Sequence, residues 1–102
     1  MEIRTADWKH EKHVPVIHVN GNEITVQVGE EVPHPNTLEH HIKWIQLYLD
    51  GVLVGQANFS AHGEKGILTE PVAVFKLSRA KGKLTALALC NIHGLWESSQ
   101  DL

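Results

Sequence analysis

The residues of this sequence best suited to chemistry are its single cysteine and several of its eight histidines. Cys90 is followed three positions later by His93, and Gly94 comes directly after it. A thiolate and an imidazole at this spacing can hold one side of a transition-metal ion of intermediate softness. Three more histidines stand upstream, near prolines or at the start of an apolar run: His13, His34 and His40. Together these residues offer one sulfur and four imidazole nitrogens to a metal ion.

Length and charge limit the class of protein. A chain of 102 residues fits one domain, residues 1–102, with a modest core. The net charge is -3 and the lysines and arginines are scattered, which argues against nucleic acid or an anionic membrane as a partner. The apolar runs are too short to span a bilayer, and the first four residues do not resemble a signal peptide. A single cysteine forms no internal disulfide, so a cytoplasmic location is expected.

The candidate ligands are predicted to lie on strands or next to them. Ile24, Val26 and Val28 alternate with polar residues, which is the period-two pattern of a strand with one buried face. Asp50 and Gly51 stand between two apolar alternating runs and predict a two-residue β-hairpin. The predicted strands are 14–19, 23–28, 40–49, 52–59, 72–77 and 84–89, with polar loops at 29–38 and 60–66.

No segment shows the sustained 3.6-residue periodicity of a helix. About seven short strands, with turn signals roughly every 8–12 residues, predict an all-β antiparallel sandwich. The last predicted strand ends at Cys90, and the pattern leaves open whether Trp96 and the polar tail after it cap the sandwich or pack on another subunit. Trp44, Tyr48 and Phe75 are expected in the core.

Three blocks of the sequence resemble one known family. Residues 11–15 (Glu-Lys-His-Val-Pro), residues 34–44 with their histidines and tryptophan, and residues 90–94 (Cys-Asn-Ile-His-Gly) are similar to the motifs of superoxide reductase. This is the iron domain that neelaredoxins share with the C-terminal part of desulfoferrodoxins. The blocks occur in the family's order, and three blocks in order are much more specific than any single one.

The resemblance implies an immunoglobulin-like β-sandwich of about seven strands that binds one iron ion, Fe²⁺ or Fe³⁺. It implies that Cys90 is the axial ligand, that Glu11 binds the ferric ion as a sixth ligand, and that Lys12 attracts an anionic substrate. The implied equatorial ligands are His13, His34, His40 and His93. Desulfoferrodoxins have an additional iron site built from four cysteines, which a chain with one cysteine cannot form. The resemblance is therefore to the neelaredoxin type.

The activity that the resemblance implies is the one-electron reduction of superoxide to hydrogen peroxide, without formation of oxygen. An external donor must return the electron, and rubredoxin is the usual donor in the family. Relatives in the family are dimers or tetramers, so a homo-oligomer is expected. The backbone N–H groups of Asn91 and Ile92 are expected to donate hydrogen bonds to the sulfur of Cys90 and so to tune the redox potential.

The same residues also fit other interpretations. A cysteine after a strand is often a small buried apolar residue, and Glu11 and Lys12 could form an ordinary exposed charge pair. Cysteine and histidine could hold zinc in a structural or storage module, although zinc prefers four ligands. A cupin-type dioxygenase and an immunoglobulin-like adhesion module are further alternatives, disfavoured by the thiolate and by the histidine content respectively. The histidines predicted not to bind metal are His10, His18, His41 and His62.

Overall fold

The computed structural model describes residues 3–4, 14–29, 40–59, 70–78 and 81–102, and it describes them as strands and the turns between them. Across these ranges no helix is long and apolar enough to cross a membrane. The strands are β1 (Ile3–Arg4), β2 (Pro15–Asn20), β3 (Glu23–Val28), β4 (Ile42–Leu49), β5 (Val52–Asn58), β6 (Val72–Lys76), β7 (Lys83–Cys90) and β8 (Gly94–Asp101).

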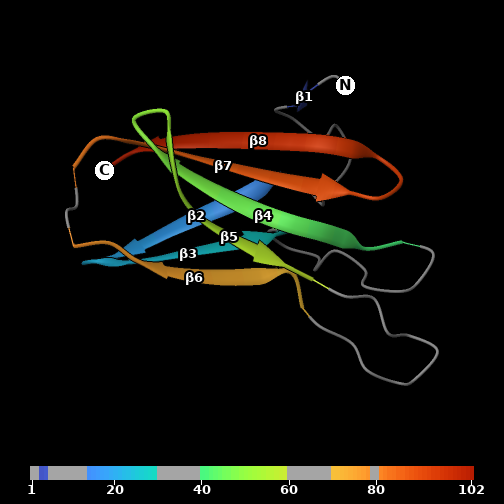
Figure 1. The fold of residues 1–102 in the computed structure, drawn as a ribbon, viewed down its shortest axis with the longest axis horizontal. Coiled ribbons are helices and arrows are strands. Elements are labelled where there is room, and N and C mark those ends of the chain that lie inside the picture. Colours follow the sequence, from blue (N-terminus) through green and yellow to red (C-terminus); the bar gives the residue numbers. More distant parts are fainter. Residues whose placement is uncertain (1–2, 5–13, 30–39, 60–69, 79–80) are drawn as a thin grey trace.

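The strands form two sheets, one lying over the other in Figure 1. The larger sheet has the order β1-β8-β7-β4-β5 and the smaller one β2-β3-β6. All pairings are antiparallel except that of β1 with β8, which is parallel. The predicted all-β antiparallel sandwich is therefore confirmed, and each of the six predicted strands matches one of β2 to β7 to within two residues at either end.

The predicted hairpin at Asp50 and Gly51 is confirmed. Leu49 pairs with Val52, so the loop between β4 and β5 has two residues. Both have positive φ, 49° for Asp50 and 81° for Gly51, as a type I′ turn requires. Oδ1 of Asp50 also accepts a hydrogen bond from the backbone N–H of Lys83 over 2.9 Å, so this turn is tied to the start of β7.

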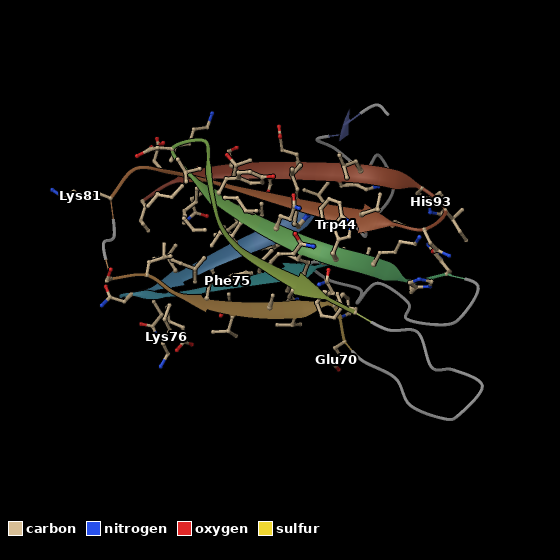
Figure 2. The ribbon with its side chains drawn as sticks, viewed as in Figure 1. Trp44, Glu70, Phe75, Lys76, Lys81 and His93 are labelled. Atoms are coloured by element: carbon tan, nitrogen blue, oxygen red, sulfur yellow. The ribbon has the colours of Figure 1, made fainter. Side chains whose placement is uncertain are left out.

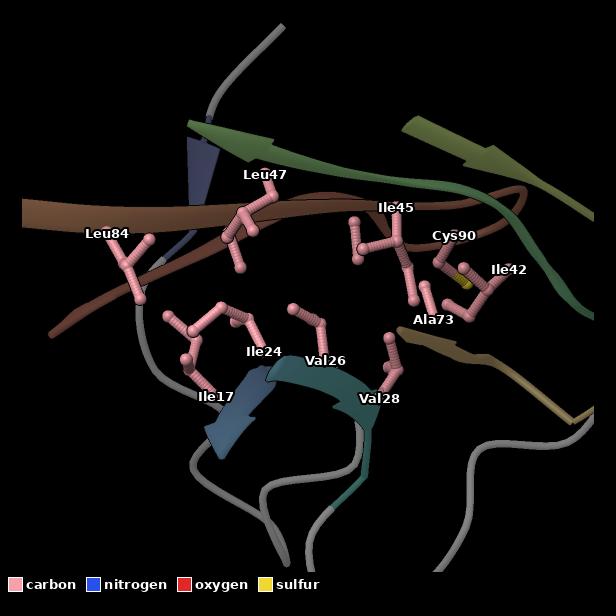
Figure 3. Close-up of a cluster of buried hydrophobic side chains, with 12 residues drawn as sticks. Ile17, Ile24, Val26, Val28, Ile42, Ile45, Leu47, Ala73, Leu84 and Cys90 are labelled. Carbon is pink, nitrogen blue, oxygen red and sulfur yellow. The ribbon is translucent and has the colours of Figure 1, made fainter. Parts of the chain in front are cut away.

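Alternation along the strands builds the core between the sheets. Ile45 and Leu47 of β4 are fully buried, whereas Trp44 and Tyr48 are only partly buried because they lie on the opposite face of the same strand. The expectation that these two aromatic residues lie in the core is wrong. Figure 3 shows the buried cluster, which comprises Ile17, Ile24, Val26, Val28, Ile42, Ile45, Leu47, Ala73, Leu84, Ala86, Ala88 and Cys90.

The tail that the sequence pattern left undecided is strand β8. It pairs with β7 from Cys90 opposite Gly94 to Lys83 opposite Asp101. Trp96 is 3% exposed and belongs to the interior of the sandwich. Ser98 donates from Oγ to the carbonyl oxygen of Pro15, which links β8 to the second sheet. The sequence pattern did not identify this strand, because the polar residues after Trp96 give it no apolar alternation.

Close approach of two edge strands fixes the other side of the sandwich. Phe75 of β6 packs against the core, and its ring lies over Gly55 of β5. A Cβ atom at Gly55 would meet Cδ1 of Phe75 at 2.5 Å, so only glycine fits beneath the ring. Phe75 therefore contacts the core from β6, as the sequence predicted.

Candidate metal centre

The β7–β8 hairpin brings Cys90 and His93 together. Cys90 is the last residue of β7 and pairs with Gly94, the first residue of β8, so the loop between them has three residues. Gly94 has a φ of 85°, the left-handed conformation that closes hairpins with three-residue loops. Local turn geometry therefore places the two side chains at the same tip, as their spacing in the sequence suggested.

Burial differs sharply between the two residues of this tip. Cys90 is 1% exposed and lies at one end of the core cluster beside Ile42, as Figure 3 shows. His93 and Ile92 are exposed, and Figure 2 shows His93 at one end of the sandwich. The sulfur therefore belongs to the buried end of the core, whereas the imidazole belongs to the exposed hairpin tip.

Two contacts join Cys90 to His93. The backbone N–H of His93 donates to Sγ of Cys90 over 3.4 Å. Nδ1 of the His93 ring lies 3.8 Å from the same sulfur. A backbone N–H directed at sulfur is an outer-shell contact of the kind that tunes a metal-bound thiolate. The hairpin thus supplies both a second ligand atom and a polar partner for the thiolate.

His40 reaches the same point from a distant part of the sequence. It stands two positions before β4, whose first residue, Ile42, pairs with Cys90. The rings of His40 and His93 make an edge-to-face contact with centroids 4.9 Å apart and an interplanar angle of 71°. Sheet pairing between β4 and β7 therefore sets the position of the third candidate ligand.

The three ligand atoms fit one metal ion. Sγ of Cys90 and one ring nitrogen each of His40 and His93 lie within 4.8 Å of one another. Donors that bind one ion at about 2.0–2.3 Å lie roughly 3–4.6 Å apart, so only a small adjustment is needed. One thiolate and two imidazoles suit zinc or iron and do not suit magnesium or calcium, which prefer oxygen ligands.

The structure brings together three of the five predicted metal ligands, His40, Cys90 and His93. The other two, His13 and His34, lie outside the described residues, as do Glu11 and Lys12. Their roles stay predictions. Two of the histidines predicted not to bind metal are described, and the three-ligand group contains neither of them: His18, which is exposed on β2, and His41.

Asn91 has a different role from the one expected. Its backbone N–H does not donate to the cysteine sulfur but to the carbonyl oxygen of His41, over 3.1 Å. Its side-chain Oδ1 accepts a hydrogen bond from the backbone N–H of His41 over 2.8 Å. The sulfur receives its N–H bond from His93 instead. The sequence signal for this link is weak, because an asparagine in a turn ordinarily bonds to its own local backbone.

Comparison with known proteins agrees with this site. The model of the family described as Desulfoferrodoxin matches residues 5–99. This chain belongs to the desulfoferrodoxin family. The match includes all three blocks that carried the resemblance in the sequence, and thus every predicted ligand of the family's iron domain.

Relatives that match this chain over most of their own length include a superoxide reductase and a neelaredoxin. The chain is 49% identical to the superoxide reductase of Pyrococcus furiosus, over 98% of this chain and 95% of the relative. It is 43% identical to the neelaredoxin of Megalodesulfovibrio gigas, over 96% and 92% respectively. The solved structure of the reduced superoxide reductase (neelaredoxin) of Archaeoglobus fulgidus superposes with a TM-score of 0.81 at 49% identity, covering 98% of this chain and 97% of that one.

Proposed function

We propose that this chain is a superoxide reductase that takes one electron and two protons to convert superoxide into hydrogen peroxide, without forming oxygen. The observation that carries the proposal is the convergence of His40, Cys90 and His93 within 4.8 Å in a member of the desulfoferrodoxin family. The metal is one iron ion in the single domain formed by residues 1–102, and bound ferrous iron supplies the electron. Its proposed ligands are His13, His34, His40, Cys90 and His93.

The donor set supports iron over zinc. Zinc sites with a structural role are closed by four ligands, whereas the proposed set contains five and leaves one position open to a small substrate. Sγ of Cys90 is buried and accepts a hydrogen bond from the backbone N–H of His93. With iron bound, Cys90 would be a thiolate ligand that supplies electron density to the metal, and this hydrogen bond would moderate that supply.

Exposure of the site suits a small anionic substrate. His93 and Ile92 are exposed at the hairpin tip, so no tunnel is required for superoxide to arrive. The chain as a whole carries a net charge of -3, which repels an anion at long range. Lys12 supplies the local positive charge that offsets this repulsion near the site. Glu11 would be the sixth ligand of a ferric ion at this site.

Electrons come from a separate protein, for which a rubredoxin-like donor is proposed. The chain is proposed to act in the cytoplasm and to form a homo-oligomer, either a dimer or a tetramer.

One feature of the described surface supports self-association. Strand β5 is an edge of the larger sheet, carries no charged residue, and exposes Val52, Leu53 and Val54 in succession. Such an edge can pair across a two-fold axis with the same strand of a second copy.

One experiment tests the function directly. The protein is reduced anaerobically and titrated with superoxide, and hydrogen peroxide and oxygen are both quantified. A reductase produces peroxide without oxygen, whereas a dismutase produces both. Peroxide accompanied by an equal yield of oxygen would contradict the proposal. Metal content and colour, recorded on the same aerobically purified sample, separate iron from the alternative zinc-binding module: thiolate-bound ferric iron is coloured and zinc is colourless.

A further inference from the structure

Asn91 connects two segments that lie 50 positions apart in the sequence. It is an exposed residue in the β7–β8 loop, where an asparagine side chain usually bonds to its own turn. Its Oδ1 instead accepts the backbone N–H of His41 over 2.8 Å, and its own N–H donates to the carbonyl oxygen of His41 over 3.1 Å. The amide oxygen thus takes the place of the backbone carbonyl oxygen that a neighbouring strand would present to the N–H group of His41.

The two bonds lie where the regular ladder between β4 and β7 ends. Pairing runs regularly up to Trp44 opposite Leu89, then shifts register before the last pair, Ile42 opposite Cys90. His40 and His41 precede β4 and so lie beyond this last pair. Asn91 therefore extends the connection between the two segments by one residue past the irregular end of the sheet.

Each end of this connection is next to a candidate ligand. His41 follows His40, and Asn91 follows Cys90 and stands two positions before His93. The edge-to-face contact of the two imidazoles depends on where the segment before β4 approaches the hairpin tip. A change in the bond between Asn91 and His41 displaces His40 relative to the pair formed by Cys90 and His93.

We infer that Asn91 is a positioning residue, whose side chain fixes His40 at the correct distance from Cys90 and His93. This inference rests on the proposed metal site. Outer-shell partners of metal ligands commonly control affinity by 10-fold to 100-fold. The oxygen is the atom that matters, because the backbone bond from Asn91 to His41 remains when the side chain is shortened.

The fold contains a matched control. Oδ1 of Asp50 accepts a hydrogen bond from the backbone N–H of Lys83 over 2.9 Å. Like Asn91, it therefore joins a segment next to β4 to a segment next to β7, here the turn after β4 and the start of β7. In Figure 1 the β4–β5 turn lies at the end of the sandwich opposite the β7–β8 tip. Asp50→Gly removes this bond without strain, because glycine accepts the positive φ of this position and two glycines are common in such turns.

The test uses Co²⁺ as the probe, bound to metal-free full-length protein, with thiolate-to-cobalt absorption as the readout. We expect Asn91→Ala to lower cobalt affinity by about 10-fold or more and to change the absorption bands. We expect Asn91→Asp, which keeps an oxygen at the same place, to retain the bands of the natural protein. Asp50→Gly should alter neither affinity nor bands, although both it and Asn91→Ala lose a side-chain hydrogen bond.

Three results would overturn the inference. Natural affinity and bands in Asn91→Ala would show that His40 is positioned without the side chain. An equal loss in Asn91→Ala and Asp50→Gly would indicate a general effect on stability. If Asn91→Ala does not fold, altered bands in a folded Asn91→Asp would count against the role of the oxygen. Failure of the proposed metal site is distinguishable from these results, because the natural protein itself would then show no thiolate-to-cobalt band.

Discussion

The backbone N–H of His93 donates to Sγ of Cys90 across 3.4 Å, while Nδ1 of the same histidine lies 3.8 Å from that sulfur. One residue therefore both donates a hydrogen bond to the sulfur and brings an imidazole nitrogen close to it. This coupling is possible because a three-residue hairpin loop turns His93 back over the end of β7. Both contacts between Cys90 and His93 therefore depend on the local geometry of one turn.

The sulfur of Cys90 should be indispensable for colour and activity. We expect Cys90→Ser to abolish the visible thiolate-to-iron absorption and to lower superoxide consumption by more than about 100-fold, beyond the loss typical of an outer-shell partner. The serine hydroxyl also enters a buried position and costs about 1–3 kcal/mol of stability. Absorption spectra, iron analysis and pulse radiolysis measure these effects. A serine variant that kept its activity would favour the dioxygenase alternative.

His93 and His18 form a matched pair of exposed histidines. His93 lies in the three-ligand group, whereas His18 lies on the smaller sheet, in β2. Because both are exposed, replacing either by alanine should change the free energy of unfolding of the metal-free protein by no more than about 0.5 kcal/mol. Only His93→Ala should reduce the iron bound per chain, as measured by elemental analysis. Equal iron content in both variants would remove His93 from the ligand set.

Lys12 should accelerate the arrival of superoxide. We expect Lys12→Ala to slow the second-order association step by about 10-fold, the lower part of the range for local electrostatic steering, and to flatten its dependence on ionic strength. Lys81→Ala removes the same charge at the opposite end of the sandwich from His93 (Figure 2) and should leave the rate nearly unchanged. Pulse radiolysis at several salt concentrations makes the comparison. Identical salt dependence in the two variants would refute the role of Lys12.

Gly55 should be intolerant of any side chain while Phe75 is present. A methyl group there meets the Phe75 ring at 2.5 Å, so Gly55→Ala should destabilise the protein by about 1–3 kcal/mol in urea denaturation. The double variant Gly55→Ala with Phe75→Leu should recover part of this loss, because the ring is removed. Metal content must be held constant, since bound metal adds to the apparent stability. Additive losses in the double variant would indicate that the contact is not the cause.

The exposed edge of β5 should govern self-association. Leu53 is 48% exposed, and Leu53→Lys introduces a charge that is repeated across a two-fold interface. We expect this variant to sediment at a lower mass than the natural protein at the same concentration. Val74→Lys places the same charge on β6 of the smaller sheet, where Val74 is 55% exposed, and should leave the mass unchanged. The opposite pattern would assign the interface to β6.

Prediction from the sequence succeeded where short-range patterns decide structure. Ile24, Val26 and Val28 alternate cleanly, and all three are buried as predicted. The hairpin at Asp50 and Gly51 was equally readable, because few residues other than glycine, asparagine and aspartate tolerate positive φ. The sequence left β8 undecided, because the polar residues after Trp96 obscure the alternation, and the prediction was wrong at Trp44, which faces outward from β4. In both cases pairing with neighbouring strands overrides the local pattern.

Local patterns were enough to predict the all-β class and the closeness of Cys90 to His93, because spacing, alternation and turn chemistry act over a few residues. The resemblance to a known family then named the candidate ligands. The position of His40 beside Cys90 and His93, and the bonds between Asn91 and His41, could be seen only in the folded sheet. Those contacts depend on the register between β4 and β7, which is set by burial of the whole sheet rather than by any local run of residues.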